Sequence, residues 1–253
     1  MEYAFLGGPG SGATLRLDYR AFAYAGKFVV GAPGKAVLRT PDGSPAVPEW
    51  KPDEPLPPAV EASAFDDDVV AAVSFSPDRT DPDCCRLRYV TVHVARRGEG
   101  LGPRLVDRTV SRLAADGYDR VKIAVNNPFA YAALYKCGFA YTGERTGIAE
   151  LVLERPTAEV DGENGTAEVD GENGTAEVDG ENGTAEVDGE NGTAAVDGDS
   201  EAAARDESGG DRYRAGLRAF RDGDRDLDPV EREFVAARLE EGEERGGRDT
   251  REE

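Results

Sequence analysis

Four consecutive copies of the nonapeptide TAEVDGENG, residues 157–192, limit what this chain can fold into more than any other feature. A fifth, degraded copy begins TAAVDG at Thr193. One valine in nine residues cannot bury a hydrophobic core, so we expect residues 157–200 to form a disordered linker. A folded domain must then lie within residues 1–156, and residues 201–253 form a separate acidic tail.

The charge of the chain divides at the same point. Residues 1–156 hold 19 of the 30 Lys and Arg residues and 20 of the 51 Asp and Glu residues, so nearly the whole net charge of -21 belongs to residues 157–253. An acidic tail cannot neutralise phosphates, which argues against a nucleic-acid-binding protein. The chain is acidic and has five lysines among its 30 basic residues. Screening by high salt suits such a chain, and we interpret its source as a salt-loving microbe such as a halophilic archaeon.

The remaining composition indicates a cytoplasmic protein. The three cysteines show no metal-ligand spacing, so we expect reduced thiols and no metal site. The first residues, MEYAFLGGPGSG, lack the basic and apolar regions of a signal peptide, and no apolar run reaches the ~20 residues of a membrane span. The oligomeric state stays open, with a homodimer as one option.

Periodicity and turn residues predict the elements of the first domain. We expect strands at 69–76 and 85–94 joined as a hairpin, a helix at 103–117, a strand at 120–125, a short helix at 127–139 and a final strand at 147–155. Residues 41–65 are rich in proline and predict a surface insertion. Within the first 40 residues we expect a strand at 13–19 and a short helix at 20–28.

The acidic tail contains two weak helix patterns. In residues 211–220, apolar side chains recur at Tyr213, Leu217 and Phe220. Residues 228–241 begin with an N-cap pattern, and Val230, Phe234 and Ala237 form a narrow apolar stripe. A hairpin of marginal helices is the favoured interpretation, and a partner-binding appendage is the alternative.

The segment RRGEGLGPRL, residues 96–105, places three glycines between a predicted strand and a predicted helix. Unpaired N–H groups gather at a helix N-terminus, where they favour an anion such as a phosphate. The P-loop pattern GxxxxGK[ST] fails here, and the dinucleotide pattern GxGxxG is broken by Pro103. The acyl-CoA pattern [RQ]xxGx[GA] fits Arg97, Gly100 and Gly102 without a gap.

This loop and a second motif resemble the GCN5-related N-acetyltransferase (GNAT) family. The stretch VHVARRGEGLGPRL, residues 92–105, is similar to the family's motif A. About 25 residues later the family has NxxAxxLYxxxGF, and residues 127–139, NPFAYAALYKCGF, fit its Asn, Ala, Gly and Phe in register. The resemblance implies an α/β (α+β) acyl-CoA N-acyltransferase fold: a mixed, mostly antiparallel sheet flanked by helices.

The resemblance also implies that acetyl-CoA is the co-substrate and an amine of unknown identity the acceptor. Its pyrophosphate would contact the loop, and its pantetheine arm would contact main-chain groups of a strand and the side chain of Asn127. The implied binding residues are Val92, Val94, Arg97, Gly98, Glu99, Gly100, Leu101, Gly102 and Asn127. The amine would attack the thioester directly, with positioning, an oxyanion donor and proton transfer from the protein.

Catalytic side chains are harder to assign. The family's thiol-protonating tyrosine would fall at Leu134, so either Tyr135 turns toward the thiol or the protein lacks this acid; Tyr131 is a weaker substitute. His93, the single histidine, could act as a base or only pack in its strand. Glu150 could reach the cleft from the last strand, as could Glu144. Two rival functions stay open: a non-catalytic acyl-CoA-binding sensor, and an interaction protein that works through its tail.

Overall fold

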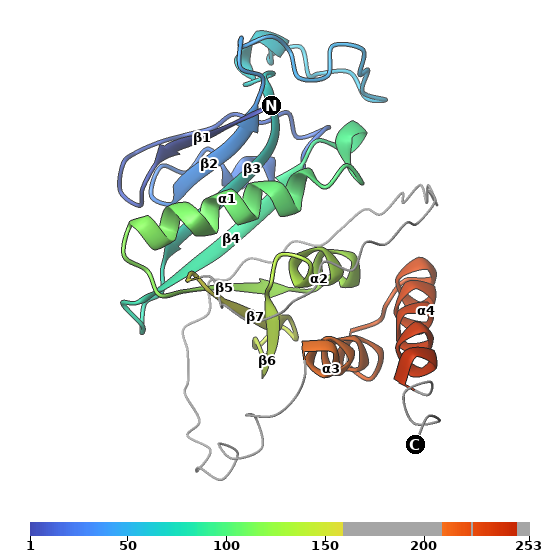
Figure 1. The fold of residues 1–253 in the computed structure, drawn as a ribbon. Coiled ribbons are helices and arrows are strands. Elements are labelled where there is room, and N and C mark those ends of the chain that lie inside the picture. The colour runs from blue at the N-terminus through green and yellow to red at the C-terminus, as the bar shows by residue number, and fades with distance from the viewer. Residues whose placement is uncertain (159–208, 224, 247–253) are drawn as a thin grey trace. The chain divides into compact units, whose positions relative to one another are not determined.

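The computed structural model describes residues 1–158, 209–223 and 225–246 (Figure 1). Its contacts divide the chain into a first unit, residues 1–157, and a second unit, residues 158–253. The repeats for which we expected disorder lie outside the described residues from residue 159 onward.

The first unit contains one seven-stranded sheet with the strand order β1-β2-β3-β4-β5-β7-β6. Only the neighbours β4 and β5 run parallel; the other neighbours are antiparallel. This confirms the predicted mixed, mostly antiparallel sheet. The strands are β1 (Glu2–Gly7), β2 (Gly34–Arg39), β3 (Val69–Pro77), β4 (Cys84–Val92), β5 (Arg120–Val125), β6 (Ala140–Arg145) and β7 (Leu151–Pro156).

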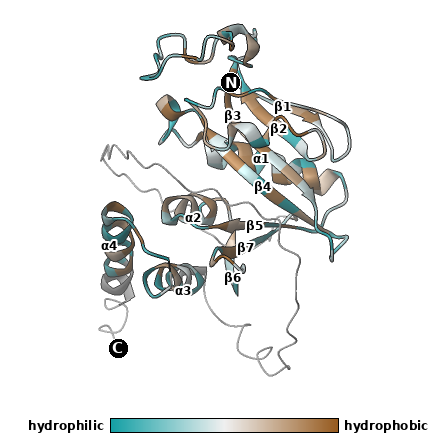
Figure 2. Cartoon of the chain, turned by 180° about the vertical axis from the view of Figure 1, so that it is seen from behind, coloured by the Kyte–Doolittle hydropathy of each residue, from teal (hydrophilic) through white to brown (hydrophobic). Residues whose placement is uncertain are grey.

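Two helices follow the parallel strands, and both were predicted from sequence. Helix α1 (Leu101–Ala115) connects β4 to β5 and lies across one face of the sheet (Figure 1). Its buried side chains recur every three or four residues and form one apolar stripe that includes Leu105, Val106, Thr109, Val110 and Leu113. Helix α2 (Pro128–Tyr135) begins directly after β5. The core strand β3 is almost wholly buried and hydrophobic (Figure 2).

The opposite face of the sheet is covered by an irregular segment instead of a helix. Leu15, Leu17, Phe22 and Phe28 pack there in one buried cluster. The predicted strand at 13–19 and helix at 20–28 are therefore wrong; the segment forms only the short 3-10 helix η1 (Ala25–Lys27). The alternation of Leu15 and Leu17 resembles a strand, but their segment lies on a sheet face, where no strand edge is available to pair with it.

Strands β1, β2 and β6 were not predicted. The final predicted strand at 147–155 corresponds to β7, which begins only at Leu151. Residues 41–65 are irregular apart from the 3-10 helix η2 (Ala62–Ala64), in keeping with the predicted insertion. The insertion is anchored, because Ala46 is buried and Trp50 packs against the irregular segment's cluster.

The second unit contains two helices that pack against each other, α3 (Gly209–Arg221) and α4 (Pro229–Gly246). Leu217 and Phe220 are buried as predicted. The stripe predicted for α4 is wrong, since Val230 is exposed and the buried side chains are Glu231, Val235 and Leu239. These three follow a spacing of four residues, which places them on one helix face. None of the described helices combines the length and apolar character needed to cross a bilayer.

The start of α4 is a capping box. The Glu231 N–H donates to Asp228 Oδ1 at 2.8 Å, and the Asp228 N–H donates to Glu231 Oε2 at 3.1 Å. Arg225 also donates to Glu231 at 2.8 Å. Two of the helix's unpaired N-terminal donors are thereby satisfied.

We predict that Asp228→Ala in the full chain destabilises α4 by about 1 kcal/mol, because it leaves these donors uncapped. Hydrogen exchange of the peptide covering residues 229–241 should quicken roughly fivefold. Asp226→Ala is the matched control, because Asp226 is 96% exposed and meets Arg232 only at 3.6 Å. Equal exchange in both variants would contradict the capping role.

Candidate functional site

The parallel strands β4 and β5 separate before β4 ends. Their pairing runs only from Cys84 opposite Arg120 to Leu87 opposite Ile123. Strand β4 stays paired with β3 on its other side as far as Val92, which pairs with Ala71. The upper half of β4 therefore has an open edge toward β5, and the two strands are seen to diverge in Figure 1.

Backbone alternation identifies which residues present their groups at this open edge. The His93 N–H donates to the Val70 carbonyl at 2.9 Å, so the backbone of His93 faces β3. Successive residues of an antiparallel strand direct their N–H and C=O groups to alternate sides. Val92 and Val90 therefore direct their N–H and C=O groups toward the opening. Val92 was predicted as a binding residue, whereas Val90 was missed, although strand alternation from Val92 could have found it.

Val94, also predicted to offer main-chain groups, lies past the end of β4. Its N–H donates to the Ala21 carbonyl at 2.9 Å, and its carbonyl accepts from Arg97 at 3.4 Å. Residues 94–96 form the 3-10 helix η3 (Val94–Arg96). Strand β4 is thus shorter than the predicted 85–94, and Val94 could bind a ligand through its backbone only if these bonds opened.

The glycine loop joins η3 to α1 and presents a row of free backbone donors. No hydrogen bond within the described part of the chain uses the N–H groups of residues 98–102. Gly98 and Gly100 have φ values of 82° and 70°, which favour glycine, and a side chain at either position would project into open space. Five N–H groups beside a helix N-terminus form a cradle that fits a pyrophosphate.

The charges around this loop are also compatible with an anion. Glu99 lies within it, but Arg96 pairs with Glu99 at 2.7 Å. The hydrogen bond from Arg96 lowers the pKa of the Glu99 carboxyl. The side chain of Arg97 is exposed at the mouth of the loop. The acidic residue is thus neutralised by its neighbour, and Arg97 adds a positive charge.

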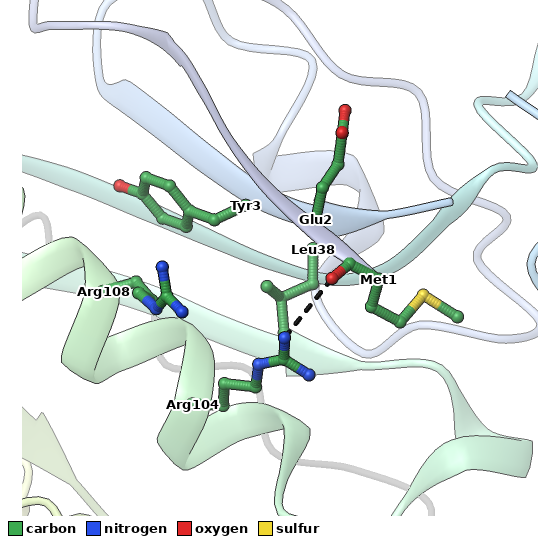
Figure 3. Close-up of a pocket in the computed structure, with 6 residues that line it drawn as sticks. All are labelled: Met1, Glu2, Tyr3, Leu38, Arg104 and Arg108. Atoms are coloured by element: carbon green, nitrogen blue, oxygen red, sulfur yellow. Dashed lines mark hydrogen bonds between the residues drawn. The ribbon is translucent and has the colours of Figure 1, made fainter. Parts of the chain in front are cut away.

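Two hollows flank the beginning of α1. The first, about 250 Å³, lies between α1 and the start of β1; Figure 3 shows Arg104 and Arg108 there beside Met1, Glu2, Tyr3 and Leu38. Arg104 donates to the Met1 carbonyl at 3.3 Å. The second, about 410 Å³, is lined by Pro103, Arg104, Asp107, Lys136, Cys137, Gly138 and Arg155. Both hollows carry basic side chains close to the loop.

Helix α2 begins at the upper end of β5, and Asn127 is its N-cap. Asn127 Oδ1 accepts hydrogen bonds from the N–H groups of Phe129 at 2.8 Å and Ala130 at 3.0 Å. This residue therefore has a structural role whether or not its amide nitrogen contacts a ligand. Within α2, Tyr131 and Leu134 are buried and Tyr135 is half-buried. The helix keeps Leu134 inward, and Tyr135 lies on the adjoining face.

His93 lies just beyond β4 in an aromatic surrounding. Phe22 and Trp50 both pack edge-on against its ring, with centroids 5.2 Å and 4.8 Å away. The Ala95 N–H donates to His93 Nδ1 at 3.2 Å, so Nδ1 carries no proton. Burial lowers the pKa of His93, with Asp18 opposing the shift. The structure gives His93 a capping and packing role and favours the neutral ring.

Glu150 precedes β7, at the end of the sheet where β5 gives way to α2. It is 5% exposed, and Thr146 Oγ1 donates to Glu150 Oε2 at 3.3 Å. Burial raises the pKa of Glu150, and the bond from Thr146 partly offsets this. A raised carboxyl pKa suits proton transfer near neutral pH. Strand β5 separates Glu150 from the open edge of β4, however.

No role was predicted for Lys35. Its side chain is fully buried on β2, and Nζ donates to the carbonyls of Ala13 at 2.7 Å, Val30 at 2.6 Å and Pro33 at 3.1 Å. Burial lowers the pKa of Lys35. This ammonium group anchors the irregular segment, residues 13–33, to the sheet.

The described residues show no cluster of three or more His, Cys, Asp and Glu side chains arranged as metal ligands. The three cysteines are buried and free of disulfides. Burial raises the pKa of Cys137 to about 11, which makes it a poor nucleophile.

Comparison with known proteins gives the family context. Residues 36–139 match the model of the acetyltransferase (GNAT) family. An N-acetyltransferase from Staphylococcus aureus Mu50 is 14% identical and aligns over 50% of this chain and 68% of its own, with a TM-score of 0.36. Nourseothricin acetyltransferase is 15% identical over 62% of this chain and 98% of its own, with a TM-score of 0.38.

An acetyltransferase from Bacillus subtilis, solved in complex with CoA, is 13% identical over 49% of this chain and 76% of its own, with a TM-score of 0.34. A comparison with curated proteins found no match. The family match runs from within β2 to Phe139, the residue before β6, and it supports a GNAT acetyltransferase domain in the first unit.

We predict that His93 makes folding sensitive to mild acid. Below the unfolded pKa of about 6.5, the unfolded chain binds a proton that the buried ring resists, so stability falls as pH decreases. His93→Asn keeps a capping oxygen but does not titrate. Urea unfolding, followed by the fluorescence of the single tryptophan, should show a larger loss of stability between pH 7.5 and pH 5.5 for the parent than for His93→Asn. Parallel pH profiles would contradict this prediction.

Proposed function

We propose that the first unit transfers the acetyl group of acetyl-CoA to an amine. The observation that carries the proposal is the combination of two unpaired sets of backbone groups. The five N–H groups of the glycine loop lie at one end, and the main-chain groups of Val90 and Val92 lie along the open edge. A ligand with a pyrophosphate joined to an amide-containing arm would use both sets.

Residues 98–102 would hold the pyrophosphate through their backbone N–H groups, with the Arg97 side chain adding charge. Val92 and Val90 would bond the amides of the pantetheine arm and position the thioester beside the open edge. Asn127 could contribute its amide nitrogen, because its oxygen is already engaged in capping α2. The contribution of these groups is binding and alignment, which hold the reacting carbonyl where the acceptor can reach it.

In the proposed reaction, the amine nitrogen attacks the thioester carbonyl carbon, a C–N bond forms, and the C–S bond breaks as coenzyme A leaves. A backbone N–H at the opening would stabilise the negative charge on the carbonyl oxygen. The proton lost by the amine would pass to a base or to water, with Glu150 and His93 as the candidates. Tyr135 would protonate the departing thiolate. We place the reaction in the cytoplasm of a salt-adapted cell.

A non-catalytic acyl-CoA sensor is the second candidate function. It is favoured by one observation: Leu134 is buried at the position where the family's tyrosine falls, and Tyr135 lies on the neighbouring face. Release of coenzyme A that depends on an added amine separates the two candidates. A sensor would bind acetyl-CoA without such release.

We predict that Gly100→Asp weakens acetyl-CoA binding by at least about 100-fold, because a carboxylate would project into the anion cradle. Aspartate tolerates the left-handed backbone better than most residues do. Gly143→Asp is the matched control, since Gly143 also has a positive φ, 88°, and open space around it. Calorimetry on the full chain in multimolar potassium chloride measures both. Absence of binding by the folded parent would refute the proposed function.

We predict that Tyr135→Phe lowers kcat about 10- to 100-fold with little change in the KM for acetyl-CoA, if Tyr135 supplies the thiolate's proton. Tyr141→Phe, at a half-buried tyrosine of β6, serves as the control. An unchanged kcat would assign Tyr135 to packing and leave the thiolate to be protonated by water.

A further inference from the structure

Half of the large hydrophobic side chains that are exposed in the described chain belong to one segment. Of the eight large hydrophobic residues that are exposed in the described chain, four belong to residues 19–30 and a fifth, Val94, is joined to this segment through the carbonyl of Ala21. The four are Tyr19, Tyr24, Val29 and Val30. Scattered exposed hydrophobic residues are ordinary, whereas a concentration of them is typical of a binding surface.

This region lies on the face of the sheet opposite the glycine loop. Gly102 of α1 approaches Val92, whose side chain therefore faces α1. The side chains of Tyr89, Thr91 and His93 point to the other face by strand alternation. Tyr89 packs there against the cluster of the irregular segment. The irregular segment and α1 thus lie on opposite faces of the sheet.

Tyr24 holds an unfavourable backbone conformation at this place. Its φ of 59° and ψ of 17° lie in the left-handed region, which is rare for a bulky residue. Its ring lies 5.4 Å from the ring of Tyr89, at an interplanar angle of 37°. Strained residues of this kind are retained where the surrounding structure fixes them and are often found at ligand sites. The strain places an exposed aromatic ring next to the open half of β4.

Two buried hydroxyl groups on the same face lack a partner in the described chain, those of Thr91 and of Ser74, which is opposite Tyr89 in the sheet. Thr91 is 4% exposed, and its Oγ1 has no hydrogen-bond partner among the described residues. Thr91 lies two residues beyond Tyr89, a rise of about 6.8 Å along the strand. A buried hydroxyl without a partner can accept a hydrogen bond from an amine N–H group. Aromatic rings and a hydroxyl acceptor therefore lie a short distance apart.

The charges nearby do not favour a polycation. The carboxylate close to His93 is that of Asp18, which Arg20 already engages at 2.7 Å. The rings of Phe22 and Trp50 pack against the His93 side chain. An apolar surface favours the neutral form of a bound amine, which is the form that attacks a thioester. Tyrosine faces also attract the ammonium form as it arrives.

We propose that the acceptor is a primary amine separated by a short chain from an aromatic group, and that Tyr24 and Tyr89 bind the aromatic group while Thr91 accepts a hydrogen bond from the amine. The inference rests on the proposed acetyl transfer and adds the class of acceptor. Tyr24 is then the residue that determines specificity.

The test compares two amines as substrates of the full chain, 2-phenylethylamine and ethylamine, by release of coenzyme A from acetyl-CoA. The expected kcat/KM is about 10- to 100-fold higher for 2-phenylethylamine. Tyr24→Gly removes the ring and accepts a φ of 59° without strain, so folding should be retained. This variant should raise the KM for 2-phenylethylamine about tenfold and thereby reduce the preference for 2-phenylethylamine over ethylamine.

Val230→Ala is the matched control, an exposed hydrophobic residue of α4 that belongs to the second unit. It should leave both amines unaffected. Equal use of the two amines by the parent, or an unchanged preference in Tyr24→Gly, would overturn this inference but leave acetyl transfer intact. Calorimetry with acetyl-CoA in the same buffer tests the proposed acetyl transfer separately. Absence of cofactor binding would overturn the proposed function itself.

Discussion

The short parallel pairing of β4 with β5 is the constraint on which the candidate site depends. Four residue pairs join the strands, and past Leu87 the backbone of β4 has a neighbour on one side only. An unpaired strand edge inside a sheet is costly unless something satisfies its N–H and C=O groups. The helix α2 and its N-cap Asn127 fill space at the upper end of β5 but do not restore the ladder. The opening is therefore built into the sheet, and the glycine loop follows directly from the strand that forms it.

A second constraint determines the conformation of the irregular segment on the face of the sheet opposite α1. The Lys35 ammonium group is buried and donates hydrogen bonds to three carbonyl oxygens of the irregular segment. These carbonyl groups would otherwise have been paired within a helix or a strand. A buried charge is tolerated only when its donors are satisfied, and here all three bonds go to backbone oxygens. The result is a segment without regular structure that still has a defined shape. Its position brings Tyr24 to the ring of Tyr89.

The parts of the site predicted from sequence are those that depend on local chemistry. The glycine loop could be located because Gly98 and Gly100 require backbone conformations that few other residues adopt, and α1 because its apolar stripe has a clear period. Residues 13–28 could not be predicted, because the alternation of Leu15 and Leu17 is the same on a sheet face as in a strand. The pairing of Trp50 with His93 joins residues 43 positions apart, and no local pattern records it. The conformation of the irregular segment and its contacts with the sheet could therefore be learned only from the structure.

The proposed acetyl transfer also requires that the proton of the attacking amine be removed. Neither candidate base combines a raised pKa, exposure and a position at the open edge: burial lowers the pKa of the enclosed His93, and Glu150 is separated from the edge by β5. A strong general base is less necessary if the acceptor binds in its neutral form, because then only the proton released after attack must be removed. The apolar surface around Tyr24 and Tyr89 would favour that form by desolvation. The same surface that selects the acceptor would thereby prepare it for attack, so binding and activation would arise from one physical property of the site.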